Sequence, residues 1–221
     1  MGRASHPAAP GPSRRLAPDR RREAIVDAAL AVALRKGLAA TTVRDIAAEM
    51  GTSSGLVHHY FASMDDVLAA AFEQAAARDL EASAAAMRDA PDPAAALRAF
   101  FRTYAPVDGD WAFQLWLDAW AEAARRPALR ETSRRLNLAW VALLQGTVEA
   151  GVAGRAFRCP DPRGAAWRIV SLIDGLALQL VAHPSTLGRD EVIGWATAAA
   201  ERELGLAPGA LSPGRDRRPG R

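Results

Sequence analysis

The chain has 221 residues, half of them apolar, which is enough to bury a sizeable core. It has no run of about 18 apolar residues, so we expect no membrane span, and its only cysteine, Cys159, cannot form an intramolecular disulfide. The net charge of +3 is uneven: bases exceed acids in residues 1–60 and again in 206–221, whereas acids exceed bases in residues 61–205. Basic ends around an acidic middle favour contact with a polyanion near the N-terminus.

Both ends of the chain are rich in Pro, Gly, Ala and Arg and show no periodicity. We therefore expect residues 1–18 to form a disordered basic arm and residues 206–221 a disordered basic tail. No apolar core follows the arginines of the arm, as a signal peptide would require. The arm is either simply solvated or a contact to the minor groove of DNA, and its residues do not decide between the two.

Between these ends apolar residues recur at helical spacing without alternating strand-like runs, so the fold is predicted to be all-α. Nine helices are expected, at 19–36, 43–50, 54–60, 64–88, 93–105, 110–125, 127–151, 161–182 and 189–204. Thr42 and Ser63 each precede an aspartate by three residues, which is the pattern of an N-terminal capping box. The predicted division is a DNA-binding unit at 19–63 and a ligand-binding and dimerisation unit at 64–205.

The most informative pattern lies in residues 21–68. Two short amphipathic helices are joined there by Gly51-Thr52-Ser53, the spacing of a helix-turn-helix whose second helix enters the DNA major groove. That second helix is short and polar, so it can approach base edges while Leu56 and Tyr60 pack inward. The amides that begin the preceding helix, together with Thr42, are expected to hold a phosphate.

A fixed order of residues continues through the same segment, and it consists of Lys36-Gly37, Thr42–Ala47, Gly51–Gly55 and Leu56–Phe61. In this order the segment resembles the TetR family of bacterial transcriptional regulators. The resemblance implies a set of DNA contacts made by Thr42, Arg44, Ser54, Gly55, His58, His59 and Tyr60. It also implies that Phe61 packs inside, and that one phosphate contact is missing because Met64 stands where the family usually has a lysine.

We expect neither a metal nor a cofactor. His58 and His59 are adjacent and point about 100° apart on a helix, so they cannot chelate one ion comfortably. No Cys, Asp or Glu lies at ligand spacing near them.

The last two predicted helices are expected to form a homodimer. The helix at 161–182 is apolar on opposite faces, so its own core can cover one face and a partner subunit the other. The helix at 189–204 carries small residues that allow close approach of a second helix. Because one recognition helix reads only a few base pairs, two copies about 34 Å apart on a pseudo-palindromic operator are expected.

Three further motifs lie in the C-terminal part: Trp116–Ala123, Arg126–Arg130 and Ile173–Leu176. They resemble the choline-sensing, BetI-type branch of the same family. Membership of the branch does not by itself fix the ligand.

The predicted ligand-binding residues are Phe113, Trp116, Trp120 and Asp174. The three aromatic residues share one face of the helix at 110–125 and form either a pocket wall or core. The opposite face carries Trp111, Asp118 and Glu122, whose acids we expect to be solvated or bonded to a neighbouring helix.

Asp174 lies on an otherwise apolar helix, so we expect its carboxylate to form an ion pair, accept a hydrogen bond or contact a ligand. A hydrogen bond between helices or subunits is favoured over ligand contact, and both interpretations are kept.

The sequence therefore predicts a cytoplasmic repressor that binds double-stranded DNA as a homodimer and is released by a small, mostly apolar effector. The alternative is a DNA-binding regulator without a small-molecule ligand, which either binds DNA constitutively or is controlled by a protein partner. An enzyme is disfavoured, because the chain has no phosphate-binding glycine loop, metal-ligand cluster or nucleophile elbow.

Overall fold

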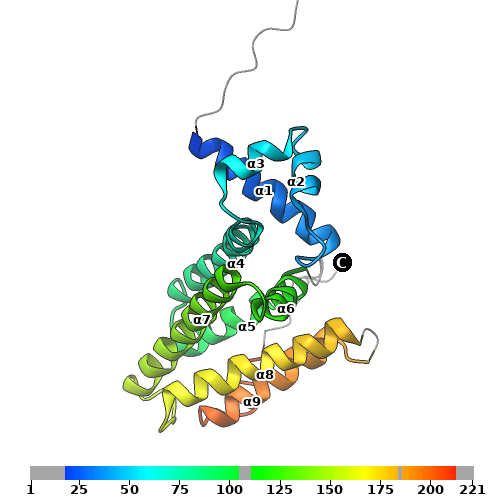
Figure 1. Ribbon diagram of the computed structural model, residues 1–221. Coiled ribbons are helices and arrows are strands. Elements are labelled where there is room, and N and C mark those ends of the chain that lie inside the picture. Colours follow the sequence, from blue (N-terminus) through cyan, green and yellow to red (C-terminus); the bar gives the residue numbers. More distant parts are fainter. Residues whose placement is uncertain (1–17, 105–110, 184–185, 213–221) are drawn as a thin grey trace, which may run out of the picture.

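The computed structural model describes residues 18–104, 111–183 and 186–212, which fold into α-helices without strands (Figure 1). The helices are α1 (Pro18–Lys36), α2 (Val43–Glu49), α3 (Ser54–Tyr60), α4 (Met64–Arg88), α5 (Pro93–Thr103), α6 (Trp111–Ala123), α7 (Pro127–Ala153), α8 (Pro162–Ala182) and α9 (Arg189–Glu203). The predicted all-α fold is confirmed, and each described helix end lies within two residues of its expected position. The ends expected at residues 105 and 110 lie outside the described residues.

Helices α1 to α3 pack around a small apolar core that also takes in the start of α4. Ile25, Ile46 and Val57 are buried in it. The predicted capping box of α2 is present, because Thr42 Oγ1 accepts from the Asp45 amide at 3.2 Å while the Thr42 amide donates to Asp45 Oδ2 at 3.0 Å. A seven-residue helix has few internal hydrogen bonds, so this cap fixes where α2 begins.

Helix α4 leads from this N-terminal unit into the rest of the molecule (Figure 1). Phe72, near its middle, belongs to a second buried cluster shared with α1, α6 and α7. A third and larger cluster lies among α5, α7, α8 and α9 around Phe100 and Leu144. The N-terminal unit and the C-terminal helices are thus joined through a continuous apolar contact rather than through a flexible linker.

Helices α8 and α9 pack side by side at the end of the molecule away from α1 to α3 (Figure 1). They bury one side of α8 but leave large apolar side chains exposed on the other. Leu172, Leu178 and Trp195 are 36%, 43% and 49% exposed. This pair of helices therefore presents an apolar surface to solvent in the single chain.

By length and composition alone, α7 and α8 are apolar enough to cross a membrane. Core helices of soluble proteins pass the same test. Here α7 packs against α4, α6 and α8, and α8 packs against α9, so neither helix indicates a membrane protein.

The expectation of a disordered tail from residue 206 is wrong for residues 206–212. The buried Glu201 carboxylate accepts hydrogen bonds from the amides of Gly209 at 2.9 Å and Leu211 at 2.8 Å. The Leu211 side chain is fully buried in the C-terminal cluster. Long-range contacts therefore order a stretch whose Pro and Gly content gives it no helix of its own. Residues 1–17 and 213–221 lie outside the described residues.

Candidate DNA-binding face and ligand cavity

The recognition helix α3 is anchored by Val57, which is 1% exposed. We expected Leu56 and Tyr60 to pack inward. Tyr60 does pack at the edge of the core, but Leu56 does not join it. The buried face of α3 is therefore centred on Val57 and not on Leu56.

The outer surface of α3 carries most of the predicted DNA contacts. Gly55, His58 and His59 are exposed, and Ser54 is half-buried at the first turn. Ser53 is the N-cap residue of α3, but its side chain makes no capping hydrogen bond. Helix α3 therefore presents a small, polar N-terminal end without a side-chain cap.

Helix α2 carries the two predicted residues that precede the turn, Thr42 and Arg44, and both are exposed. The Thr42 hydroxyl, however, donates to Asp45 Oδ2 at 2.7 Å, and Lys36 Nζ lies 2.7 Å from Asp45 Oδ1. These two contacts hold the pKa of Asp45 at about 2. The Thr42 hydroxyl proton is therefore already committed within the chain, which leaves Arg44 as the better placed group for a phosphate.

Two aromatic contacts hold the C-terminal end of α3. The Arg22 guanidinium of α1 lies 4.5 Å from the centre of the Phe61 ring, and the His59 and Tyr60 rings meet edge to face at 5.1 Å. Phe61 itself is buried, as predicted. Arg22 was missed in the sequence, where nothing except its position in the basic first 60 residues distinguishes it.

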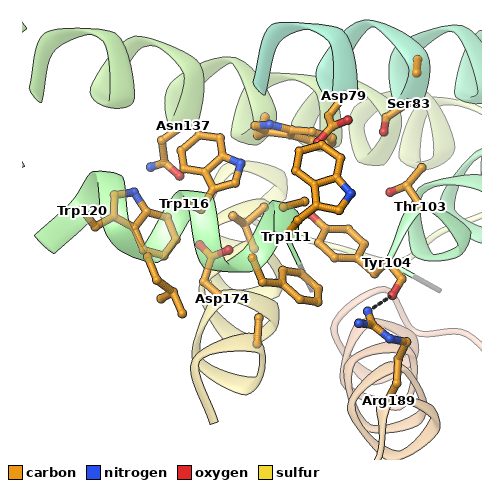
Figure 2. A pocket seen from close by; sticks show the side chains of 17 residues that line it. Asp79, Ser83, Thr103, Tyr104, Trp111, Trp116, Trp120, Asn137, Asp174 and Arg189 are labelled. Carbon is orange, nitrogen blue, oxygen red and sulfur yellow. Dashed lines mark hydrogen bonds between the residues drawn. The ribbon is translucent and has the colours of Figure 1, made fainter. Parts of the chain in front are cut away.

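A cavity of about 350 Å³ lies among the C-terminal helices (Figure 2). All four predicted ligand-binding residues, Phe113, Trp116, Trp120 and Asp174, line it. The other aromatic, polar and charged residues of the lining are Asp79, Ser83, Thr103, Tyr104, Trp111, Asn137, Trp140 and Arg189. Helices α4 to α9 all contribute to the wall.

The aromatic rings form a continuous wall. Trp116 and Trp120 have ring centres 5.5 Å apart, and Tyr104 and Phe113 stack at 5.9 Å with an angle of 19° between their planes. Trp111, which we placed on the opposite face of α6, also lines the cavity and is 42% exposed. It is the first residue of α6.

Two carboxylates reach the cavity from different helices, Asp79 from α4 and Asp174 from α8 (Figure 2). Burial raises the pKa of Asp174 to about 7 and also raises the pKa of Asp79. Both carboxylates, in addition to its own burial, raise the pKa of the Tyr104 hydroxyl. The inter-helix hydrogen bond favoured for Asp174 is absent from the part of the chain that the structure describes.

Asp79 was missed in the sequence, although the signal was available. It lies seven residues after the buried Phe72 and four after the buried Ala75, so it continues the inner face of α4. The argument that singled out Asp174, an acid on an apolar helix face, therefore applies to it equally.

Arg189, at the start of α9, lies at one side of the cavity. Its Nη1 donates to the backbone carbonyl of Tyr104 at 2.9 Å, and its guanidinium lies 5.3 Å from the centre of the Phe113 ring. It therefore ties the start of α9 to the end of α5 and to α6.

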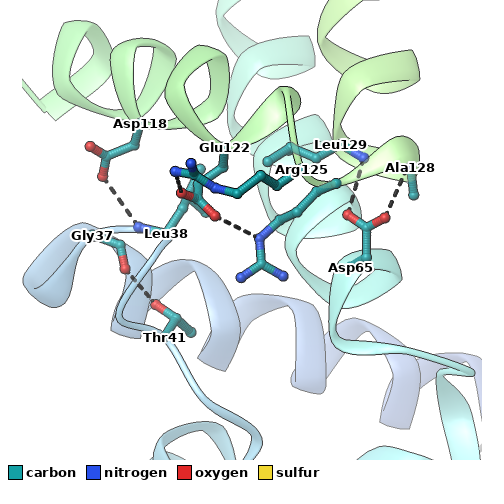
Figure 3. A network of polar contacts seen from close by, with 10 residues as sticks. Gly37, Leu38, Thr41, Asp65, Asp118, Glu122, Arg125, Ala128 and Leu129 are labelled. Atoms are coloured by element: carbon teal, nitrogen blue, oxygen red, sulfur yellow. Dashed lines mark hydrogen bonds and ion pairs between the residues drawn. The ribbon is translucent and has the colours of Figure 1, made fainter.

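The face of α6 that points away from the cavity is bonded to the N-terminal unit (Figure 3). Asp118 Oδ2 accepts from the Leu38 amide at 3.2 Å, and Asp118 Oδ1 accepts from Gln114 at 2.9 Å. Leu38 follows Gly37, whose φ of +83° ends α1 in a conformation that favours glycine. Asp118, expected to be solvated or bonded to a neighbouring helix, is thus bonded within α6 and to the turn that follows α1.

Two more acids fix the junction between α6 and α7 (Figure 3). Glu122 is buried and accepts from Arg126 Nε at 2.9 Å and from Arg125 at 3.2 Å, and these bonds lower its pKa. Asp65, in the first turn of α4, accepts from the amides of Ala128 and Leu129 at 2.9 and 3.3 Å. The first amides of α7 are thus capped by an acid that belongs to α4.

Two family models match the chain. Residues 25–82 match the model described as bacterial regulatory proteins of the tetR family, and residues 93–205 match the C-terminal model of the BetI-type transcriptional repressor. The HTH-type transcriptional regulators BetI of Rhizobium meliloti and Stenotrophomonas maltophilia are 34% and 33% identical to the chain. Each alignment covers 72% of this chain, and it covers 77% and 80% of the relative, respectively.

Solved structures share the fold. A putative transcriptional regulator from Pseudomonas aeruginosa PAO1 aligns with a TM-score of 0.74 at 26% identity, over 89% of this chain and 95% of its own. A putative regulator from Saccharomonospora viridis, solved in complex with choline, aligns with a TM-score of 0.76 at 24% identity, over 84% and 98%. With the helix-turn-helix and the helical C-terminal domain in place, the chain belongs to the TetR family of bacterial transcriptional regulators and carries a C-terminal domain of the BetI type.

Proposed function

We propose that this protein is a cytoplasmic, homodimeric repressor that leaves its operator when a small organic cation fills the cavity between α4 and α9. The observation that carries the proposal is the cavity itself, in which a wall of aromatic rings surrounds two carboxylates. A regulator that responds to no small molecule has no use for such a space, which counts against the alternative of constitutive or partner-controlled binding. The family regulates transcription and is not enzymatic.

The chemistry of the wall favours a cation. Ring faces attract alkylated ammonium groups, and a carboxylate supplies the opposite charge. Relatives named BetI and the choline complex of the Saccharomonospora protein agree with this class of ligand. The mostly apolar effector expected from the sequence stays within this proposal, and the two acids in the wall narrow it to an effector that also carries a positive charge.

The apolar surface of α8 and α9 is proposed as the homodimer interface. Leu172, Leu178 and Trp195 have no cover in the single chain, and large apolar side chains clustered on a surface mark a protein contact. A dimer of this kind places two α3 helices on one side, where they can read two half-sites about 34 Å apart. Gly55, His58 and His59 are proposed to face base edges, and Arg44 a phosphate.

Helix α6 is proposed to transmit the signal. One of its faces forms the cavity wall through Trp116 and Trp120, and the other holds the Leu38 amide through Asp118. An effector that prefers one position of α6 changes the geometry of the turn between α1 and α2. The population of dimers with the operator spacing falls accordingly.

Electrophoretic mobility shift with DNA from upstream of the protein's own gene tests the proposal. Choline and longer alkyltrimethylammonium ions should release the DNA, and they should quench tryptophan emission with the same midpoint. Trp120→Ala, inside the cavity, should lower the response and leave operator affinity intact, whereas Leu138→Ala on the exposed side of α7 should change neither. Operator binding that no organic cation affects would leave the constitutive alternative standing.

A further inference from the structure

The two carboxylates of the cavity are unusual in having no partner. Among the described residues, neither Asp79 nor Asp174 accepts a hydrogen bond or forms an ion pair, although other acids of the interior, such as Glu122, do both. Buried charges are normally paired, because removal from water is costly. Figure 2 shows the two side chains entering the cavity from different helices, so they lie at separate places on its wall.

The basic residue of the wall does not compensate them. Arg189 contacts the Tyr104 carbonyl and the Phe113 ring. A guanidinium beside either acid would lower that acid's pKa, but the pKa values of Asp79 and Asp174 are both raised, and burial is the cause. The cavity thus holds two separate carboxyl groups that no basic group of the described chain pairs with, and each can be ionised when a cation binds beside it.

We infer that the preferred effector is an organic dication, with one cationic group held at Asp79 and the other at Asp174. The inference rests on the proposed function and narrows it from organic cations in general to those with two separated charges. The tryptophan rings between the two ends supply an apolar surface for the spacer.

The size of the cavity agrees with such a ligand. Its volume of about 350 Å³ corresponds to roughly a dozen waters at about 30 Å³ each. One trimethylammonium group fills a small part of that space and compensates a single carboxylate. The second carboxylate must then stay protonated or remain unpaired, whereas a dication compensates both.

A matched pair of probes tests the inference on the full-length chain. Pentyltrimethylammonium and pentamethylene-bis(trimethylammonium) share the same spacer and differ in having one or two cationic ends. Titration calorimetry at pH 8 should show the bis-cation binding at least tenfold more tightly than the monocation. A series of spacers from three to eight carbons should show one length that binds most tightly.

Single substitutions assign the two ends. Asp79→Asn and Asp174→Asn should each reduce the affinity for the bis-cation at least tenfold, to the level of the monocation. The affinity for the monocation should fall in at most one of them. Glu131→Gln removes an exposed acid of α7 that pairs with Arg134 outside the cavity, and it should change neither affinity. Unchanged circular dichroism and operator binding identify variants that are folded.

Different failures lead to different conclusions. If both probes bind with the same affinity and release the operator, the dication is excluded while the cation-responsive repressor stands. If the bis-cation loses affinity in only one of the two aspartate variants, a second charge site is likewise excluded. If neither probe binds, the proposed function itself fails.

Discussion

Effector binding should depend on pH through Asp174. Burial raises the pKa of this carboxyl to about 7, so near neutral pH the empty cavity contains a mixture of protonated and ionised forms. A cation is held by the ionised form. Below pH 7 a proton must therefore leave before the cation binds, and the affinity should rise as the pH rises.

The magnitude follows from the pKa. With a pKa of about 7, the ionised fraction is roughly one tenth at pH 6 and roughly nine tenths at pH 8. The apparent Kd for a monocation should then fall by about tenfold between these values and change little above pH 8. Asp79 and Tyr104 also titrate in this cavity, but the pKa of Tyr104 is raised further above its ordinary alkaline value, so its hydroxyl stays neutral here.

Calorimetry in two buffers of different ionisation enthalpy would measure both the affinity and the proton released on binding. Asp174→Asn should bind more weakly at pH 8 and should lose the pH dependence between pH 6 and 8. An affinity that is flat over this range in the wild type, or one that increases toward low pH, would refute the reasoning.

Stability supplies an independent check on the same residue. The folded-state pKa of Asp174 lies above the ordinary value of 3.8, so the folded state holds the proton more tightly than the unfolded state. Stability is therefore lost as the pH rises from about 4 through 7. At pH 8, Asp174→Asn should be more stable than the wild type by roughly 1 to 3 kcal/mol, the usual cost of removing a polar group from water without a hydrogen bond. Thermal unfolding should show a larger difference between the two proteins at pH 8 than at pH 5, because only part of the loss has occurred by pH 5.

Four other substitutions should separate the parts of the molecule. Asp118→Ala removes the acceptor of the Leu38 amide. In mobility shift, the factor by which the effector lowers operator affinity should decrease by up to about tenfold. In calorimetry without DNA, the affinity for the effector should be unchanged. His58→Ala should alter the preference among operator variants. Arg44→Ala should weaken binding to all duplexes and reduce the number of counterions released on binding by about one. If both variants weakened binding to every sequence equally, the assignment of His58 to bases and of Arg44 to a phosphate would be wrong. Leu211→Ala should lower the free energy of unfolding by about 2 to 5 kcal/mol in chemical denaturation, because the side chain is fully buried, and a change near zero would mean that the ordered segment adds nothing to the core.

The boundaries of the helices could be predicted because local residues set them. Gly37 and Gly51 end α1 and α2 with φ values of +83° and +62°, where other residues are strained, and Pro93 begins α5. The capping box at Thr42 is equally local, because both partners lie within three residues. Such signals do not depend on what the rest of the chain does.

The cavity could be predicted only in part, because periodicity gives a face of one helix but not what faces it. Phe113, Trp116 and Trp120 share a face of α6, and that face does line the cavity. The positions of Asp79 and Trp111 in the cavity wall depend on how α4 and α6 pack together, which periodicity does not give. The exact register at the recognition helix likewise depends on packing, which selected Val57 rather than Leu56 as the anchor.

The ordered segment at residues 206–212 shows the limit of composition as a guide. Its Pro and Gly content gives it no helical tendency, yet the Glu201 carboxylate, in the last turn of α9, accepts hydrogen bonds from two of its amides. A buried acid near the end of α9 needs hydrogen-bond donors, and the following backbone provides them. The signal was therefore the acid on the inner face of α9 rather than anything within the segment itself.

An effector can shift the equilibrium between two positions of α6 only by the difference between its binding free energies for those two positions. In this cavity that free energy has an identifiable source, since Asp79 and Asp174 are partly buried and have no partner in the described chain. A cation that compensates them gains most where the rings on α6 close around it, because attraction between charges strengthens as water is excluded. The same movement displaces Asp118 relative to the Leu38 amide, since both faces belong to one rigid helix. In the proposed function, the uncompensated acids of the cavity supply the binding free energy, and the hydrogen bond between Asp118 and the Leu38 amide carries the change to the DNA-binding unit.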